Sequence, residues 1–226
     1  MDLGILFFMR KLLQFEFSFS RSMFFLILLV NLSYLSVFAS AQTIAGSDSE
    51  GTILDSFRSN TFSFLAKRYN LTSDRNEKLR IAWIFYSLGW NSEQAKKLLL
   101  AQTLETDPEL RTAVQYALGR VSNDPEVQAV LRGIILNDKS WYFRDKAGCA
   151  LANDQIHLTD KQRIELLRTT IQDLKSPDLA VRDISIRVLM GLTGQRKDYN
   201  PQAPDSERER VIEIWEKWLA EYESQF

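Results

Sequence analysis

Four segments of the chain repeat one short pattern, and this repeat constrains the fold more than any other feature. In each segment an apolar residue precedes an arginine, a stripe of small or apolar residues follows, and a leucine closes the stripe. The arginines lie 31, 33 and 38 residues apart, at Arg80, Arg111, Arg144 and Arg182. A motif that recurs at a period of roughly 30 to 40 residues, on every second helix, is typical of an α-solenoid.

The spacing of apolar residues is helical almost everywhere from Ile53 onward. Nine helices are predicted, over residues 53–69, 74–89, 92–105, 107–121, 124–137, 140–152, 159–175, 177–193 and 206–223. Most of the connecting loops are short, and short loops place neighbouring helices antiparallel. We therefore predict an all-α fold, an α-solenoid of about four antiparallel helix pairs with one extra helix on their N-terminal side.

Residues that cap helices mark where the predicted helices begin and end. Three starts have the spacing of a capping box: Asp74 with Glu77, Thr159 with Gln162, and Ser206 with Glu209. Three others have a capping residue before a proline at the first helical position: Asp107, Asp124 and Ser176. The expected stops are Gly89, the pair Asn137 and Asp138, and Gly194.

Several of these segments resemble a known family of repeats. They run from Asp107-Pro-Glu-Leu-Arg111 to Gly119, from Phe143-Arg144-Asp145 to Leu151, and from Val181-Arg182-Asp183 to Leu189. They are similar to HEAT repeats, including the short HEAT-like repeats of phycobilin-lyase type, over roughly residues 74–193. The closing stretch, from Leu192 to Trp218, also resembles the end of many bacterial HEAT-repeat proteins.

The resemblance implies a superhelix that binds another protein and residues that hold its repeats together. Hydrogen bonds between repeats would form a ladder that uses Arg111, Arg144, Asp145, Arg182 and Asp183. The second helices of the pairs (92–105, 124–137 and 159–175) would line the concave side. Their polar residues Lys97, Arg132 and Arg168 are the candidates for contact with a partner.

The first 41 residues have the parts of a secretory signal peptide. Arg10, Lys11 and Arg21 precede an apolar run over 23–38, and Ala39-Ser40-Ala41 provides a small-x-small cleavage site. We predict cleavage before Gln42, a flexible linker over 42–52 and a solenoid domain over 53–226, in a periplasmic or secreted protein. Met23 is a possible true start, and the alternative is an uncleaved membrane anchor over 23–41.

Charge and the scarcity of reactive residues limit the functions to consider. Without residues 1–41 the chain has 25 Lys and Arg against 27 Asp and Glu, whereas nucleic-acid binders usually have a basic excess. Cys149 is the single cysteine and His157 the single histidine, so a site with several zinc ligands of these types is not available. No Gly-rich phosphate loop, Gly-x-Ser-x-Gly or His-Glu-x-x-His pattern occurs. We predict no catalytic, metal or cofactor site.

The last helix carries one apolar stripe, made of Val211, Ile214, Trp215, Trp218, Leu219 and Tyr222. The stripe predicts that Trp215 and Trp218 dock this helix on the stack and close it, and the alternative is a ligand-stacking site.

Together these observations favour an exported, non-enzymatic protein-binding scaffold or adaptor. A membrane-anchored accessory subunit is the alternative. A third is a chaperone or lyase-like factor, because phycobilin-lyase-type relatives assist tetrapyrrole attachment to a client.

Overall fold

The computed structural model describes residues 47–226, and this part of the chain is helical without strands, as predicted. Residues 1–41, the predicted leader, lie outside the described residues, as does the start of the predicted linker. Residues 56–226 form one compact unit. The helices are α3 (Ser47–Leu71), α4 (Arg75–Leu88), α5 (Glu93–Leu100), α6 (Pro108–Arg120), α7 (Pro125–Asn137), α8 (Trp141–Asn153), α9 (Asp160–Asp173), α10 (Leu179–Thr193) and α11 (Asp205–Glu223).

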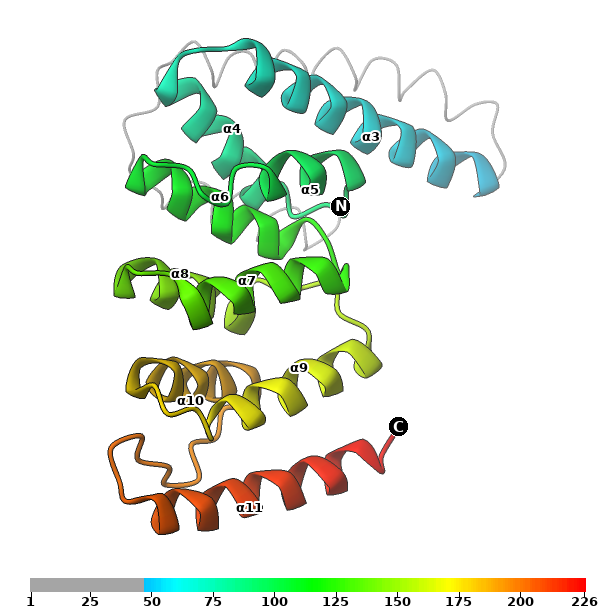
Figure 1. Ribbon diagram of the computed structural model, residues 1–226. Helices are drawn as coiled ribbons and strands as arrows, with labels where there is room; N and C mark the ends of the chain where they lie inside the picture. The colour runs from blue at the N-terminus through cyan, green and yellow to red at the C-terminus, as the bar shows by residue number, and fades with distance from the viewer. Residues whose placement is uncertain (1–46) are drawn as a thin grey trace. The chain divides into compact units, whose positions relative to one another are not determined.

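The helices from α4 onward form two layers (Figure 1). In the first layer α4, α6, α8 and α10 pack directly on one another in chain order. In the second layer α5, α7, α9 and α11 follow one another in front of the first in Figure 1. Each second-layer helix from α5 to α9 also contacts the first-layer helix that follows it in the chain. This arrangement confirms the predicted α-solenoid of antiparallel helix pairs.

Small residues allow the first-layer helices to approach closely. Ala113 and Ala117 of α6 and Ala147 and Ala150 of α8 are fully buried between neighbouring helices. An alanine side chain is a single carbon, so space remains beside it between the helices. Larger side chains fill this space and are buried in the same core: Val114, Leu118, Leu151 and Leu189. The spacing of alanines in the sequence therefore fixes which layer is tightly packed.

Most of the predicted helix ends are present. Thr159 and Gln162 form the predicted capping box, and Asp107 and Asp124 cap α6 and α7 by accepting backbone N–H groups. Gly89 and Gly194 end α4 and α10 in the left-handed region, at φ of 58° and 71°, where a Cβ would be strained.

Two of the predicted capping boxes are wrong. Asp74 caps α4 through the N–H of Asn76, but Glu77 pairs with Arg68 of α3, and that ion pair takes the side chain away from the helix start. Helix α11 begins after Pro204 without a side-chain cap, so Ser206 and Glu209 lie inside it.

Among the helix bounds that differ from the prediction, three are explained by the structure. Helix α3 begins at Ser47, inside the predicted linker, because extending an existing helix costs little per residue. Helix α5 ends at Leu100, and turns replace its predicted last residues. Helix α10 starts after Asp178 because this carboxylate accepts both the N–H of Ala180 and a hydrogen bond from Arg144. Ser176 lacks that second interaction.

An irregular loop over 195–204 takes the place of a first-layer helix after α10. Tyr199 is buried in it and donates its hydroxyl to the carbonyl of Leu174 at 2.7 Å. The chain then enters α11, which packs against α9 through the fully buried Trp215 and through Ile212 and Leu219. Among residues 47–226, no helix is both long and apolar enough to cross a membrane.

Candidate protein-binding surface

A cleft of about 220 Å³ opens between α7 and α9 in the second layer. Its apolar lining comes from α7, α9 and the two first-layer helices behind them: Ala129, Ile135, Leu151, Leu166 and Val188. Its polar lining is Gln128, Arg132, Glu165, Thr169, Thr170, Asp173 and Ser185. The first-layer side chains form part of the lining because α7 and α9 leave a gap between them through which the layer behind is reached.

Arg132 and Asp173 bridge this cleft from α7 to α9. The guanidinium donates from Nε to Oδ2 at 2.8 Å and from Nη2 to Oδ1, so the pair is bidentate. The Asp173 side chain is only 9% exposed, whereas Arg132 is 39% exposed. The hydrogen bond to Asp173 raises the pKa of Arg132. Arg132 therefore presents one side to solvent while its donors hold the two helices in register.

The other two candidate contact residues lie elsewhere on the second layer. Lys97 of α5 is 73% exposed and lies 3.6 Å from Glu93 of its own helix. Arg168 of α9 pairs with Glu165 and reaches Glu223 of α11 at 2.8 Å. The structure places Arg132 in the cleft but does not bring the three residues together, and acidic partners already neutralise Arg132 and Arg168.

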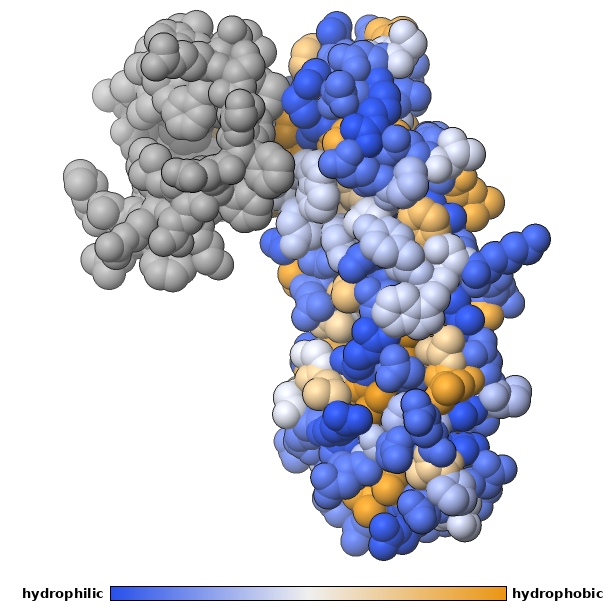
Figure 2. Space-filling view, turned by 90° about the vertical axis from the view of Figure 1, so that its left-hand side faces the viewer, coloured by the Kyte–Doolittle hydropathy of each residue, from blue (hydrophilic) through white to orange (hydrophobic). Residues whose placement is uncertain are grey.

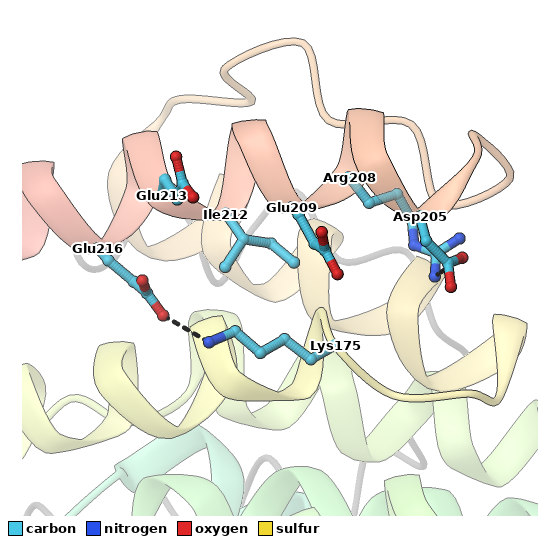
Figure 3. Close-up of a pocket in the computed structure, with 7 residues that line it drawn as sticks. All are labelled: Lys175, Asp205, Arg208, Glu209, Ile212, Glu213 and Glu216. Atoms are coloured by element: carbon cyan, nitrogen blue, oxygen red, sulfur yellow. Dashed lines mark hydrogen bonds and ion pairs between the residues drawn. The ribbon is translucent and has the colours of Figure 1, made fainter.

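A second, polar cleft of about 370 Å³ lies beside α11 (Figure 3). Lys175, just beyond α9, pairs with Glu216 at 2.7 Å, and Arg208 pairs with Asp205. The lining also includes Glu209 and Glu213, so four carboxylates face two cations. This negative balance favours cationic groups of a ligand and disfavours phosphates.

A ladder of arginines links successive pairs at the connections from second-layer to first-layer helices. Arg111 of α6 donates from Nε to the carbonyl of Thr103 at 2.9 Å and from Nη2 to Asp138. Arg144 of α8 donates in the same way to the carbonyl of Ile135 and to Asp178, both at 2.6 Å. Each arginine thus links the preceding second-layer helix, or the turn directly after it, to the turn before the next first-layer helix.

The ladder continues at both ends with altered partners. Arg182 of α10 donates to three backbone carbonyls, those of Ser176 and Pro177 before α10 and that of Pro201 in the loop over 195–204. At the other end Arg75, and not Arg80 of the sequence repeat, makes the link, with Nε 3.0 Å from Oδ2 of Asp107. These connections lie on the left in Figure 1, the side that Figure 2 shows as largely hydrophilic with separate apolar patches.

The two predicted ladder aspartates have other partners. Asp145 accepts from Arg187 of α10 at 2.6 Å, so it links α8 to α10 outside the arginine ladder. Asp183 pairs with the same Arg187 at 3.0 Å, within α10. The carboxylates that complete the ladder precede the arginines in the chain, as Asp107 precedes Arg111 and Asp178 precedes Arg182 by four residues.

Comparison with known proteins identifies the repeats. Residues 65–152, from within α3 to the end of α8, match the family model described as HEAT repeats. The chain is a HEAT-like repeat protein. No curated protein and no solved structure matches it. HEAT repeats generally mediate protein–protein interaction, and HEAT-repeat proteins are typically non-enzymatic scaffolds.

The single cysteine and the single histidine of this HEAT-like protein make structural contacts. Cys149 is half-buried beside the hydroxyl of Tyr116, and burial raises its pKa, which disfavours the reactive thiolate. His157 donates from Nε2 to the carbonyl of Gly89 at 2.7 Å. Within residues 47–226, no group of three His, Cys, Asp or Glu side chains has the arrangement of a metal site.

A buried carboxyl group lies between the turns of the HEAT-like pairs. Asp154, in the turn after α8, is 4% exposed. It contacts the Tyr86 hydroxyl, and the Arg120 guanidinium lies 3.8 Å away and over the Tyr86 ring. Burial raises the pKa of Asp154 from 3.8 to about 6, because the nearby guanidinium compensates the lost hydration only in part.

We expect Asp154→Asn to stabilise the protein at pH 7.5 and to have little effect at pH 4. The native state holds the Asp154 proton up to about pH 6, whereas the unfolded state releases it near its ordinary pKa. The native state is therefore penalised as pH rises through this window, by up to about 3 kcal/mol. Thermal melts of both proteins from pH 4 to 8 measure the difference.

Asp178→Asn is the control, because its effect on the melting temperature at neutral pH should have the opposite sign. The Arg144 hydrogen bond lowers the pKa of Asp178, so its carboxylate stabilises the native state above about pH 4 and this stabilisation disappears as pH falls. The Asp178→Asn variant should therefore melt below the wild type at neutral pH. Equal melting of the Asp154→Asn variant and the wild type across the range would show that Asp154 ionises normally.

Proposed function

We propose that this HEAT-like protein is a non-enzymatic scaffold that holds a segment of a partner protein in the cleft between α7 and α9. The observation that carries the proposal is the cleft itself, with an apolar lining beside the Arg132–Asp173 bridge. At about 220 Å³ the cleft is smaller than the roughly 300–1,000 Å³ of small-molecule sites, and its size suits side chains of a polypeptide.

The lining indicates how such a segment is recognised. Apolar side chains of the partner would lie against the exposed Ala129 at the mouth of the cleft, whose floor is the buried Ile135, Leu151 and Val188. The exposed side of Arg132 would face the partner's backbone or a polar side chain. Because Arg132 is already held by Asp173, it loses little side-chain entropy on binding. The neighbouring acidic cleft beside α11 favours a segment that continues with basic residues.

We propose that the scaffold acts outside the cytoplasm. Support comes from the sequence of residues 1–41, where bases, an apolar run and a small-x-small site follow one another in the order of a signal peptide. N-terminal sequencing of the natural protein tests this part. A first residue of Gln42 supports export with cleavage, and retention of residues 23–41 in a detergent-dependent form supports the anchored alternative.

Site-specific crosslinking tests the binding surface. A photo-reactive amino acid at the exposed Ala129 should crosslink one partner protein in the natural host, and the same group at Ser87 of α4 should not. Thr169→Arg, which fills the cleft from α9, should abolish the Ala129 crosslink without lowering the melting temperature. Equal crosslinking from Ser87, or a crosslink that persists in the Thr169→Arg variant, would place the partner elsewhere.

A further inference from the structure

The side of α11 opposite α9 carries an exposed face with a defined order of residues. Arg210, Ile214, Lys217 and Glu221 follow one another at spacings of four, three and four, which places them on one face of the helix. All four are exposed, and Ile214 is 48% exposed. Trp218 lies beside Ile214 on the same side and is partly buried.

The charges of this face are left without partners inside the described residues. Four charged residues of α11 are paired within the described residues: Arg208 with Asp205, Glu216 with Lys175, and Glu223 with Arg168. Arg210 and Glu221 make no ion pair with any residue of 47–226, and the same is true of Glu207, Glu209, Glu213 and Lys217. Arg210 is basic and lies near the start of α11, and Glu221 is acidic and lies near its end.

The two ends of this order of residues are complementary to each other. When two copies of α11 lie antiparallel, a two-fold axis near residue 216 places Arg210 opposite Glu221 of the second copy and Ile214 opposite its Trp218. The two Lys217 side chains then lie near the axis, where their length lets the ammonium groups turn to solvent. The same axis generates both contacts twice, as an isologous interface requires. We propose that a second copy of this chain docks on the face formed by Arg210, Ile214, Trp218 and Glu221, in a two-fold dimer.

The aromatic group at the centre of this face is held in place before any partner binds. The Trp218 ring meets the Trp215 ring edge to face at 5.4 Å between centroids and stacks on Tyr222 at 5.3 Å. The Lys197 ammonium lies 5.0 and 5.3 Å from the Trp215 and Trp218 ring centroids. A rigid, partly exposed tryptophan loses little entropy on docking, which is typical of the residues that anchor interfaces.

A charge exchange tests the dimer in the full chain, with non-ionic detergent present so that the apolar run 23–38 does not itself associate. Sedimentation equilibrium should show a monomer–dimer equilibrium below about 100 µM. Arg210→Glu and Glu221→Arg should each raise the dissociation constant at least about tenfold, because each places like charges opposite one another twice. The variant with both changes should return to within about threefold of the wild type.

Lys161→Glu, an equally exposed charge reversal on α9, is the matched control and should leave the dissociation constant unchanged. A wild-type chain that stays monomeric at about 100 µM overturns the proposal. So does a double variant that fails to recover while its melting temperature equals that of the wild type. The crosslink from Ala129 is measured independently, so loss of the dimer leaves the test of the cleft unaffected.

Discussion

Replacing Trp215 with alanine is expected to lower the free energy of unfolding by about 3–5 kcal/mol. The indole is fully buried where α11 packs on the stack, so truncation leaves a cavity that the surrounding helices fill only in part. Domains of this size are held by only about 5–15 kcal/mol. The melting temperature, measured by calorimetry, should therefore fall by roughly 6–20 °C.

Two further variants separate packing from ligand stacking. Trp218 is partly exposed, so Trp218→Ala should cost less than Trp215→Ala, and the double variant should cost more than either. Trp215→Phe keeps much of the buried ring and removes an indole N–H that has no acceptor within 47–226, so its cost should be small. If the Trp215→Ala protein melted like the wild type, α11 would not close the stack, and a ligand-stacking role would regain support.

Gly148→Ala is expected to destabilise the protein by about 1–3 kcal/mol. Gly148 lies in α8 where α10 crosses it, and a Cβ there would meet Cγ2 of Ile184 at 2.5 Å and Cγ2 of Val188 at 3.5 Å. Both neighbours are β-branched and buried, so neither moves aside without shifting α10. Urea unfolding at constant pH measures the loss.

Gly133→Ala provides the control of opposite sign. Gly133 also lies inside a helix, α7, but a Cβ there meets nothing within 4 Å. The substitution should stabilise the protein by about 0.5–1 kcal/mol, because alanine loses less backbone entropy in a helix than glycine does. If Gly148→Ala stabilised the protein as Gly133→Ala does, α8 and α10 would have room to move apart. The close packing of the first layer would then limit its side chains less than we infer.

The helix positions were predictable because local chemistry determines them. Thr159 with Gln162, and Asp107 and Asp124 before their prolines, use only nearby backbone groups, and the structure confirms these starts. A residue elsewhere in the chain decides two of the differences, the start of α10 and the capping box of α4. Arg144, 34 positions away, makes Asp178 the better cap of α10, and Arg68 draws Glu77 away from the start of α4.

The candidate site was less predictable for a similar reason. The pattern of second helices correctly placed Arg132 on that layer, but the cleft depends on the gap that α7 and α9 leave between them. The bidentate pair with Asp173, 41 positions along the chain, gives no local signal. Two ladder carboxylates did leave a local signal, because Asp107 stands four residues before Arg111 and Asp178 four residues before Arg182.

The hydrogen bond from His157 to Gly89 has a consequence for cooperativity. In a linear array of repeats each unit contacts only its neighbours, so such arrays fray from their ends in steps. Here the turn after α8 reaches back to the turn after α4, past the last turn of α6, where Gln155 donates to the carbonyl of Gly119 at 3.0 Å. Three successive pairs are thereby coupled, and loss of one pair removes bonds from the other two. These pairs should exchange their amide hydrogens at one common rate of opening, with partly unfolded species confined to the elements outside them, which are α3, α10, α11 and the loop before α11.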